Sequence, residues 1–100
     1  MIPKKEDAIR RQREEAWIGD AVLGLFVREW ILTRAGRMDA ELFALLTSNH
    51  FLSRLGQPTA VEAEIGRRYR SDGPMVARQW IEEKLLPVFE RTLNRRQGRH

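Results

Sequence analysis

Asp20 and Glu62 are the residues whose type and setting best suit metal binding or acid–base chemistry. Asp20 is the only acid in the run AWIGDAVLGLF (residues 16–26), and Glu62 also lies beside an apolar stripe. Each has a glycine four residues later, Gly24 and Gly66, on the same helical face, where a bare patch permits close helix approach or leaves room for an ion and a substrate. A carboxylate in such a setting is costly unless it is paired, hydrogen-bonded or bound to a cation. We therefore expect either a metal site or carboxylates satisfied by an arginine or a helix N-terminus.

Other catalytic chemistries have little support in the sequence. The chain has no cysteine, which excludes disulfides, zinc–thiolate sites and thiol catalysis. Its two histidines are His50, which we expect at or near the surface, and the terminal His100. There is no phosphate-binding glycine loop, G-x-S-x-G or H-E-x-x-H motif, so we expect no nucleotide cofactor.

The charge distribution permits a polyanionic partner. The formal net charge is +4 and the isoelectric point about 10.3. Basic residues cluster in three places, 10–13, 67–70 and 95–100, which fits either a nucleic-acid surface or solvated helix faces. No apolar run approaches the roughly 20 residues that span a membrane, and no secretory signal is evident. We expect a cytoplasmic protein without a membrane partner.

The spacing of apolar residues predicts an all-α domain of about five helices, with no repeated unit. A first apolar stripe over residues 8–31 should end at Gly36, a natural residue to follow a helix. Asp39 should lie near the start of the second helix, and Ser48 or Asn49 should cap the third. We assign residues 1–94 to a single domain and 95–100 to a basic tail.

The second half of the chain should form two further helices. One covers TAVEAEIGRRYR, residues 59–70, and carries only a narrow apolar stripe. After the turn SDGP, Pro74 should open the last helix, and Pro87 should kink or break it. Three tryptophans and four phenylalanines are many for 100 residues with such a polar helix. Some aromatic surface is therefore expected to be buried against a second copy.

Three segments, in order, resemble ribonuclease III domains. EAWIGDAVLGLFVREWIL is similar to the signature helix of that family, and TSNHFLSRLG to its SNxxLARIA helix. PTAVEAEIGRRYRSDGPMVARQWIEEKLLP resembles its ADVFEALIGAIYLDGGLEAARKFIEKLL segment. The resemblance covers most of residues 14–91 and implies a ribonuclease III-like helical bundle, shortened in the middle and paired as a two-fold dimer.

The family usually places four acids as E-x-x-x-D on one helix and D-x-x-E on another. Asp20 matches the second acid and Glu62 the fourth, whereas Ala16 and Thr59 stand at the first and third. The compact Mini-III branch, which lacks a double-stranded-RNA-binding domain, often shows the same pattern, as in ALAYIGDAV and STAFEAL. This resemblance implies a catalytic site on Asp20 and Glu62 that holds Mg²⁺, or Mn²⁺, with Thr59 contributing a hydroxyl through water.

The activity implied by the resemblance is endonucleolytic hydrolysis of double-stranded or structured RNA in RNA processing. Arg67, Arg68 and Arg70 are the candidates for phosphate contacts, with a solvated face as the alternative. Trp17 stands where relatives insert an aromatic side chain into the partner of a homodimer; its other possible role is in the chain's own core. The competing interpretation is a ribonuclease III fold without catalysis, acting as an RNA-binding or ribosome-associated structural protein. An unrelated helical interaction module is a third alternative.

Overall fold

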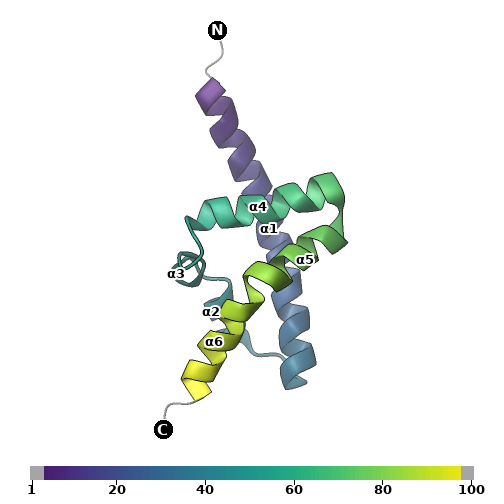
Figure 1. The fold of residues 1–100 in the computed structure, drawn as a ribbon, viewed down its shortest axis with the longest axis vertical. Coiled ribbons are helices and arrows are strands. Elements are labelled where there is room, and N and C mark those ends of the chain that lie inside the picture. Colours follow the sequence, from purple (N-terminus) through teal and green to yellow (C-terminus); the bar gives the residue numbers. More distant parts are fainter. Residues whose placement is uncertain (1–3, 98–100) are drawn as a thin grey trace.

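A computed structural model describes residues 4–97, which form six α-helices and no strand (Figure 1). The helices are α1 (Lys4–Ala35), α2 (Ala40–Leu46), α3 (Asn49–Leu52), α4 (Pro58–Asp72), α5 (Pro74–Lys84) and α6 (Leu86–Gln97). The prediction of an all-α protein is confirmed. None of the described helices is both long and apolar enough to cross a membrane.

The helix boundaries lie where local backbone chemistry places them. Gly36, with φ 74°, follows the end of α1, a conformation that glycine adopts without a Cβ clash. Asp39 caps α2 by accepting a 2.9 Å hydrogen bond from the backbone N–H of Leu42. Ser48 caps α3 by accepting one of 3.1 Å from the N–H of Phe51. Such caps satisfy N–H groups that the first helical turn leaves unbonded.

The last predicted helix is interrupted near Pro87, as the sequence predicted, and the part after the interruption is the sixth helix. The backbone N–H of Leu85 still bonds to the carbonyl of Ile81, at 2.8 Å, and there α5 ends. Proline has no N–H and its ring clashes with the carbonyl four residues earlier. The predicted last helix is therefore two helices, α5 and α6.

The core lies where α1 is covered by the other helices. It contains Leu23, Phe26, Val27, Ile31, Leu42, Leu46, Phe51, Leu52, Val61, Ile65, Ile81, Leu85, Phe89 and Leu93. Phe89 of α6 packs between α1 and α3, because the centre of its ring lies 5.4 Å from that of Trp30 and 5.3 Å from that of Phe51. Of all the helices, α4 packs most extensively on α1.

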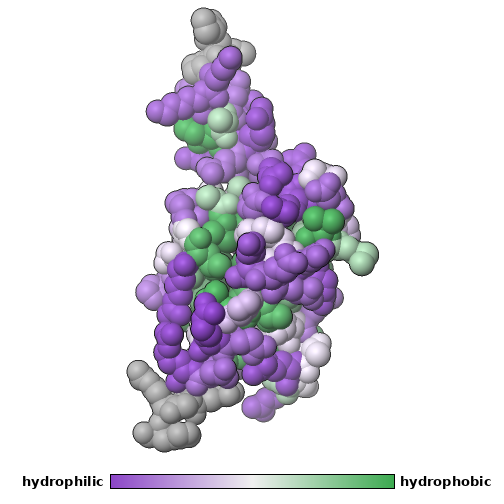
Figure 2. Space-filling view, in the orientation of Figure 1, coloured by the Kyte–Doolittle hydropathy of each residue, from purple (hydrophilic) through white to green (hydrophobic). Residues whose placement is uncertain are grey.

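The first turns of α1 extend beyond this body. The helix has 32 residues, and its N-terminal part projects away from the other elements (Figures 1 and 2). Ile9 on that part is 44% exposed. At the other end, α6 runs to Gln97, so residues 95–97 of the predicted tail are helical, while 98–100, including His100, lie outside the described residues.

Candidate functional site

The candidate site lies where α1 and α4 cross at very short distance. A Cβ atom added at Gly19 would overlap the backbone carbonyl of Glu62 and lie 2.9 Å from the backbone nitrogen of Gly66. A Cβ added at Gly66 would overlap the carbonyl of Glu15 and lie 2.9 Å from the nitrogen of Gly19. Each glycine costs about 1 kcal/mol of helix propensity relative to alanine. The two backbones can approach this closely only because both positions lack a side chain.

These contacts are reciprocal because the same short pattern occurs in both helices. EAWIG at residues 15–19 of α1 and EAEIG at residues 62–66 of α4 share the form E-A-x-I-G. Their alanines, Ala16 and Ala63, are 7% and 6% exposed at the crossing. A five-residue pattern thus occurs twice, and the crossing has an approximate local two-fold symmetry.

At one end of the crossing, Asp20 meets Glu62. Asp20 is exposed on α1 and Glu62 is half-buried on α4. Burial, the negative charge of Asp20 and a hydrogen bond with Asp20 together raise the pKa of Glu62 to about 7. The sequence-predicted pair is therefore brought together, as two carboxyl groups that face each other across two helices.

The symmetric end of the crossing has a different charge pattern. The counterpart of Glu62 is Glu15, and that of Asp20 is Arg67, so an acid and a base occur where the first end has two acids. Hydrogen bonding and charge from Glu64, with a smaller effect of Glu15, raise the pKa of Arg67. The repeat thus carries like charges at one end and opposite charges at the other.

Arg67, Arg68 and Arg70 lie along α4, and two of them are engaged within the chain. Glu64 accepts 2.5 Å hydrogen bonds from Arg67 Nη2 and from Arg68 Nε. Burial acts to raise the pKa of Glu64, but the hydrogen bonds and charges of the two arginines outweigh it, so the pKa is lowered. The Arg68 guanidinium also lies 5.7 Å from the centre of the Trp80 ring. Arg70 is exposed and, among residues 4–97, forms no ion pair.

The donors at the Asp20–Glu62 end suit a hard divalent cation. Oxygen atoms are the ligands that Mg²⁺ prefers, and in the described part of the chain neither carboxylate forms an ion pair, which favours a bound cation. Thr59, also half-buried, precedes Glu62 by one turn of α4. Within the described residues there is no cluster of three or more acidic, histidine or cysteine side chains around a common point. The described residues would therefore supply two carboxylates, leaving the remaining positions of a cation to other ligands.

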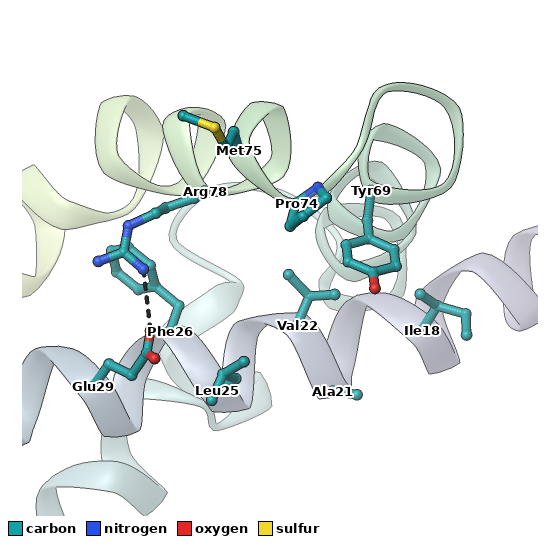
Figure 3. Close-up of a pocket in the computed structure, with 10 residues that line it drawn as sticks. All are labelled: Ile18, Ala21, Val22, Leu25, Phe26, Glu29, Tyr69, Pro74, Met75 and Arg78. Atoms are coloured by element: carbon teal, nitrogen blue, oxygen red, sulfur yellow. Dashed lines mark hydrogen bonds and ion pairs between the residues drawn. The ribbon is translucent and has the colours of Figure 1, made fainter.

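Trp17 lies on the outer face of α1 and does not belong to the core. Its side chain is 78% exposed, and Leu25, two turns further on, is 58% exposed. Beside them, a groove of about 400 Å³ runs between α1 and the junction of α4 with α5 (Figure 3). The groove is lined by Ile18, Ala21, Val22, Leu25, Phe26, Glu29, Tyr69, Pro74, Met75 and Arg78.

The groove is largely apolar, and its charged residues lie at one end (Figure 3). There the Arg78 guanidinium donates a 3.1 Å hydrogen bond to Glu29 and lies 5.1 Å from the centre of the Phe26 ring (Figure 3). Met75 on its edge is 82% exposed. The face of the molecule seen in Figure 2 is largely hydrophilic, with patches of apolar surface exposed between the hydrophilic residues.

Sequence reasoning selected one glycine of the crossing and missed the other. Gly66 is at the crossing, as the spacing indicated. Gly24 is not at the crossing, because its nearest neighbours are the side chains of Arg28 and Phe43. The second glycine is Gly19, next to Asp20. The recurrence of E-A-x-I-G was the available signal, since it pairs Gly19 with Gly66.

Comparison with known proteins adds no family assignment. No protein-family model matches the chain, and searches of curated proteins and of solved structures found no match either.

Proposed function

We propose that this protein is a Mg²⁺-dependent endoribonuclease of ribonuclease III type that cuts double-stranded or structured RNA as a homodimer. The observation that carries this proposal is the contact of Asp20 with Glu62. Two helices distant in sequence bring two carboxyl groups together, and none of the ion pairs among the described residues involves either of them. Such an arrangement lowers stability at neutral pH unless a proton or a cation is bound, which is typical of a site kept for function.

The two acids have complementary roles in this proposal. Asp20, exposed, and Glu62, half-buried, would hold Mg²⁺ or Mn²⁺, and Thr59 would contribute a hydroxyl through water. The bound cation would make water easier to deprotonate and offset the charge that develops on the phosphate. Glu62 must lose its proton to bind a cation, so binding should strengthen as the pH rises through about 7.

RNA would be recognised through its backbone. A duplex RNA offers its phosphates and 2′-hydroxyls to a protein more readily than its base edges. Arg70 is exposed on α4, as is Arg67, and Arg68 is half-buried. Release of Arg67 or Arg68 from Glu64 on contact with phosphate would extend this surface. Binding should then weaken steeply with added salt.

The dimer in this proposal pairs the outer faces of two α1 helices. A two-fold interface places the same surface on both partners, so a protruding group and a hollow must lie on one face. Trp17 protrudes one turn before Ala21, which lines the groove. Each Trp17 could thus enter the groove of the other copy.

Cleavage of a long duplex RNA by purified protein with Mg²⁺ tests the nuclease. We expect Asp20→Asn and Glu62→Gln each to abolish cutting, because each removes one of the two charged ligands. Glu41→Gln, which changes an exposed acid on α2, is the matched control and should cut normally. RNA that stays intact with excess wild-type protein would refute the enzyme.

Light scattering tests the dimer. The wild-type protein should have the mass of two chains at micromolar concentration, and Trp17→Ala should reduce it to one. Met38→Ala removes another exposed apolar side chain, 85% exposed and outside this groove, and should leave the dimer intact. A monomeric wild-type protein would remove this part of the proposal.

One observation favours a second candidate, an RNA-binding or ribosome-associated structural protein without catalysis. The described residues hold only a pair of acids at the site and no larger ligand cluster, and fewer carboxylates attract a divalent ion less strongly. Salt-sensitive RNA binding without cleavage, unchanged in Asp20→Asn, would support this candidate over the enzyme.

A further inference from the structure

We propose that Gly19 and Gly66 are positioning residues that set the separation of the Asp20 and Glu62 carboxyl groups. The inference deepens the proposed function, on which its catalytic meaning rests, but it can be tested without RNA. It assigns a role to two residues that touch neither a cation nor a substrate. Their effect is exerted through the backbones of the two helices.

The argument begins with the covalent neighbours of the two acids. Gly19 directly precedes Asp20, and the atom that a Cβ at position 19 would overlap is the carbonyl oxygen of Glu62 itself. The contact therefore joins the peptide beside one acid to the backbone of the other. Any side chain at position 19 would move the two acids apart.

Gly66 controls the same separation from the opposite side of the crossing. A Cβ there would overlap the carbonyl of Glu15, one turn from Gly19 and Asp20. The overlap is with backbone, which cannot turn aside as the end of a flexible side chain can. Helix α4 would have to move away from α1 and take Glu62 with it.

Gly24 provides the comparison within α1. A Cβ at this position would lie 3.1 Å from Arg28 Nη1 and 3.8 Å from the Phe43 ring, both parts of side chains. Arg28 is exposed, and its guanidinium, 4.1 Å from the centre of the Phe43 ring, is the end of a flexible side chain. Alanine at position 24 should therefore leave the crossing unchanged, which makes Gly24→Ala a matched control.

The experiment follows the titration of Glu62 by carbon-13 NMR and the affinity for Mn²⁺ in the full chain. In Gly66→Ala, the titration midpoint should move by about one pH unit toward the ordinary range of glutamate, because Asp20 is then more distant. Mn²⁺ affinity should fall roughly tenfold, as in other proteins whose supporting residues are altered. Gly24→Ala should match the wild type in both readouts. An unchanged midpoint in Gly66→Ala, or an equal change in Gly24→Ala, would overturn the inference.

A second variant covers the case in which Gly66→Ala does not fold. Asp20→Glu lengthens an exposed side chain and leaves the crossing intact. If the glycine contacts fix the helices, the added methylene must change the Glu62 midpoint; an unchanged midpoint would show that the helices adapt, and would overturn the inference. Wild-type protein that neither binds Mn²⁺ nor cuts RNA would refute the proposed function, while the titration would still decide the role of the glycines.

Discussion

The two ends of the α1–α4 crossing are built from one pattern and differ in charge. At one end Asp20 faces Glu62, and at the other Arg67 takes the place of Asp20 and Glu15 that of Glu62. The backbone contacts of Gly19 and Gly66 are the same at both ends. The difference in pKa behaviour therefore comes from the side-chain charges and their burial rather than from the packing of the helices.

This comparison separates what stabilises the fold from what is available for function. At the end with Arg67, the arginine is attracted by Glu15 and hydrogen-bonded to Glu64, so its charge is balanced without a bound ion. The end with Asp20 keeps the Glu62 carboxyl partly protonated at neutral pH. A repulsive pair persists only where the surrounding structure imposes it, and here the imposing structure is the glycine crossing.

The largest expected effect is that of Asp20→Arg, which gives the first end the charge pattern of the second. The pKa of Glu62 should fall from about 7 toward or below the ordinary glutamate range, because an opposite charge favours the ionised carboxylate. RNA cleavage should fall below detection, since a cation would face an arginine. Carbon-13 titration and a cleavage assay measure both. Retained cleavage would show that the acid pair is not the catalytic site.

An intermediate effect is expected for Glu62→Gln on stability. The folded-state pKa of Glu62, about 7, lies above the ordinary glutamate pKa of 4.5, so the folded chain binds more protons between these pH values. Stability of the wild type should therefore fall as the pH rises from about 4.5 to about 7, and stay level above that. Glutamine removes this loss, so the variant should be more stable at pH 8 by about 1 to 2 kcal/mol, after allowance for solvent screening.

Urea unfolding at pH 8 and at pH 4.5 measures that difference. The gain should be present at pH 8 and vanish at pH 4.5, where the wild-type carboxyl is already protonated. A gain of equal size at both pH values would mean that charge is not its source. Glu41→Gln, at an exposed position, serves again as the control.

The smallest effect is expected for Arg67→Asp, which gives the second end the charge pattern of the first. Like charges would then meet Glu15 and Glu64, and stability at pH 8 should fall by about 1 kcal/mol or less, because the Arg67 side chain is 50% exposed. Arg67→Gln removes the attraction to Glu15 and Glu64 without adding a negative charge, so its difference from Arg67→Asp measures the repulsion alone. If both variants are equally stable at pH 8, the two ends are not electrostatic counterparts.

Much of the fold could be predicted because its signals are local. Asp39, Ser48 and Gly36 act at the helix ends where their backbone chemistry indicated. Pro87 gave the break, although not the number of helices, because periodicity alone does not distinguish a kinked helix from two. Asp20 and Glu62 could be selected because a carboxylate beside an apolar stripe is visible in a sequence, and the two do lie together, while their role as a site stays a prediction.

The parts that could not be predicted depend on how helices meet. A helical face says which residues can be neighbours, but not which glycine contacts another backbone, so Gly24 was selected in place of Gly19. The position of Trp17 had the same ambiguity, because apolar spacing does not show that a side chain at the edge of a stripe is 78% exposed. The engagement of Arg67 and Arg68 by Glu64 was equally open to prediction from their i, i+3 and i, i+4 spacing, but was overlooked.

The projection of α1 beyond the body has a consequence for local stability along one continuous helix. Residues such as Ile9 have little to pack against, and an unsupported helical end of a few turns is marginal in water. From Glu15 onward the same helix is held by α4 and then by the core. The amide hydrogens of α1 should therefore exchange with solvent at two very different rates, fast in the first turns and slow from the crossing onward.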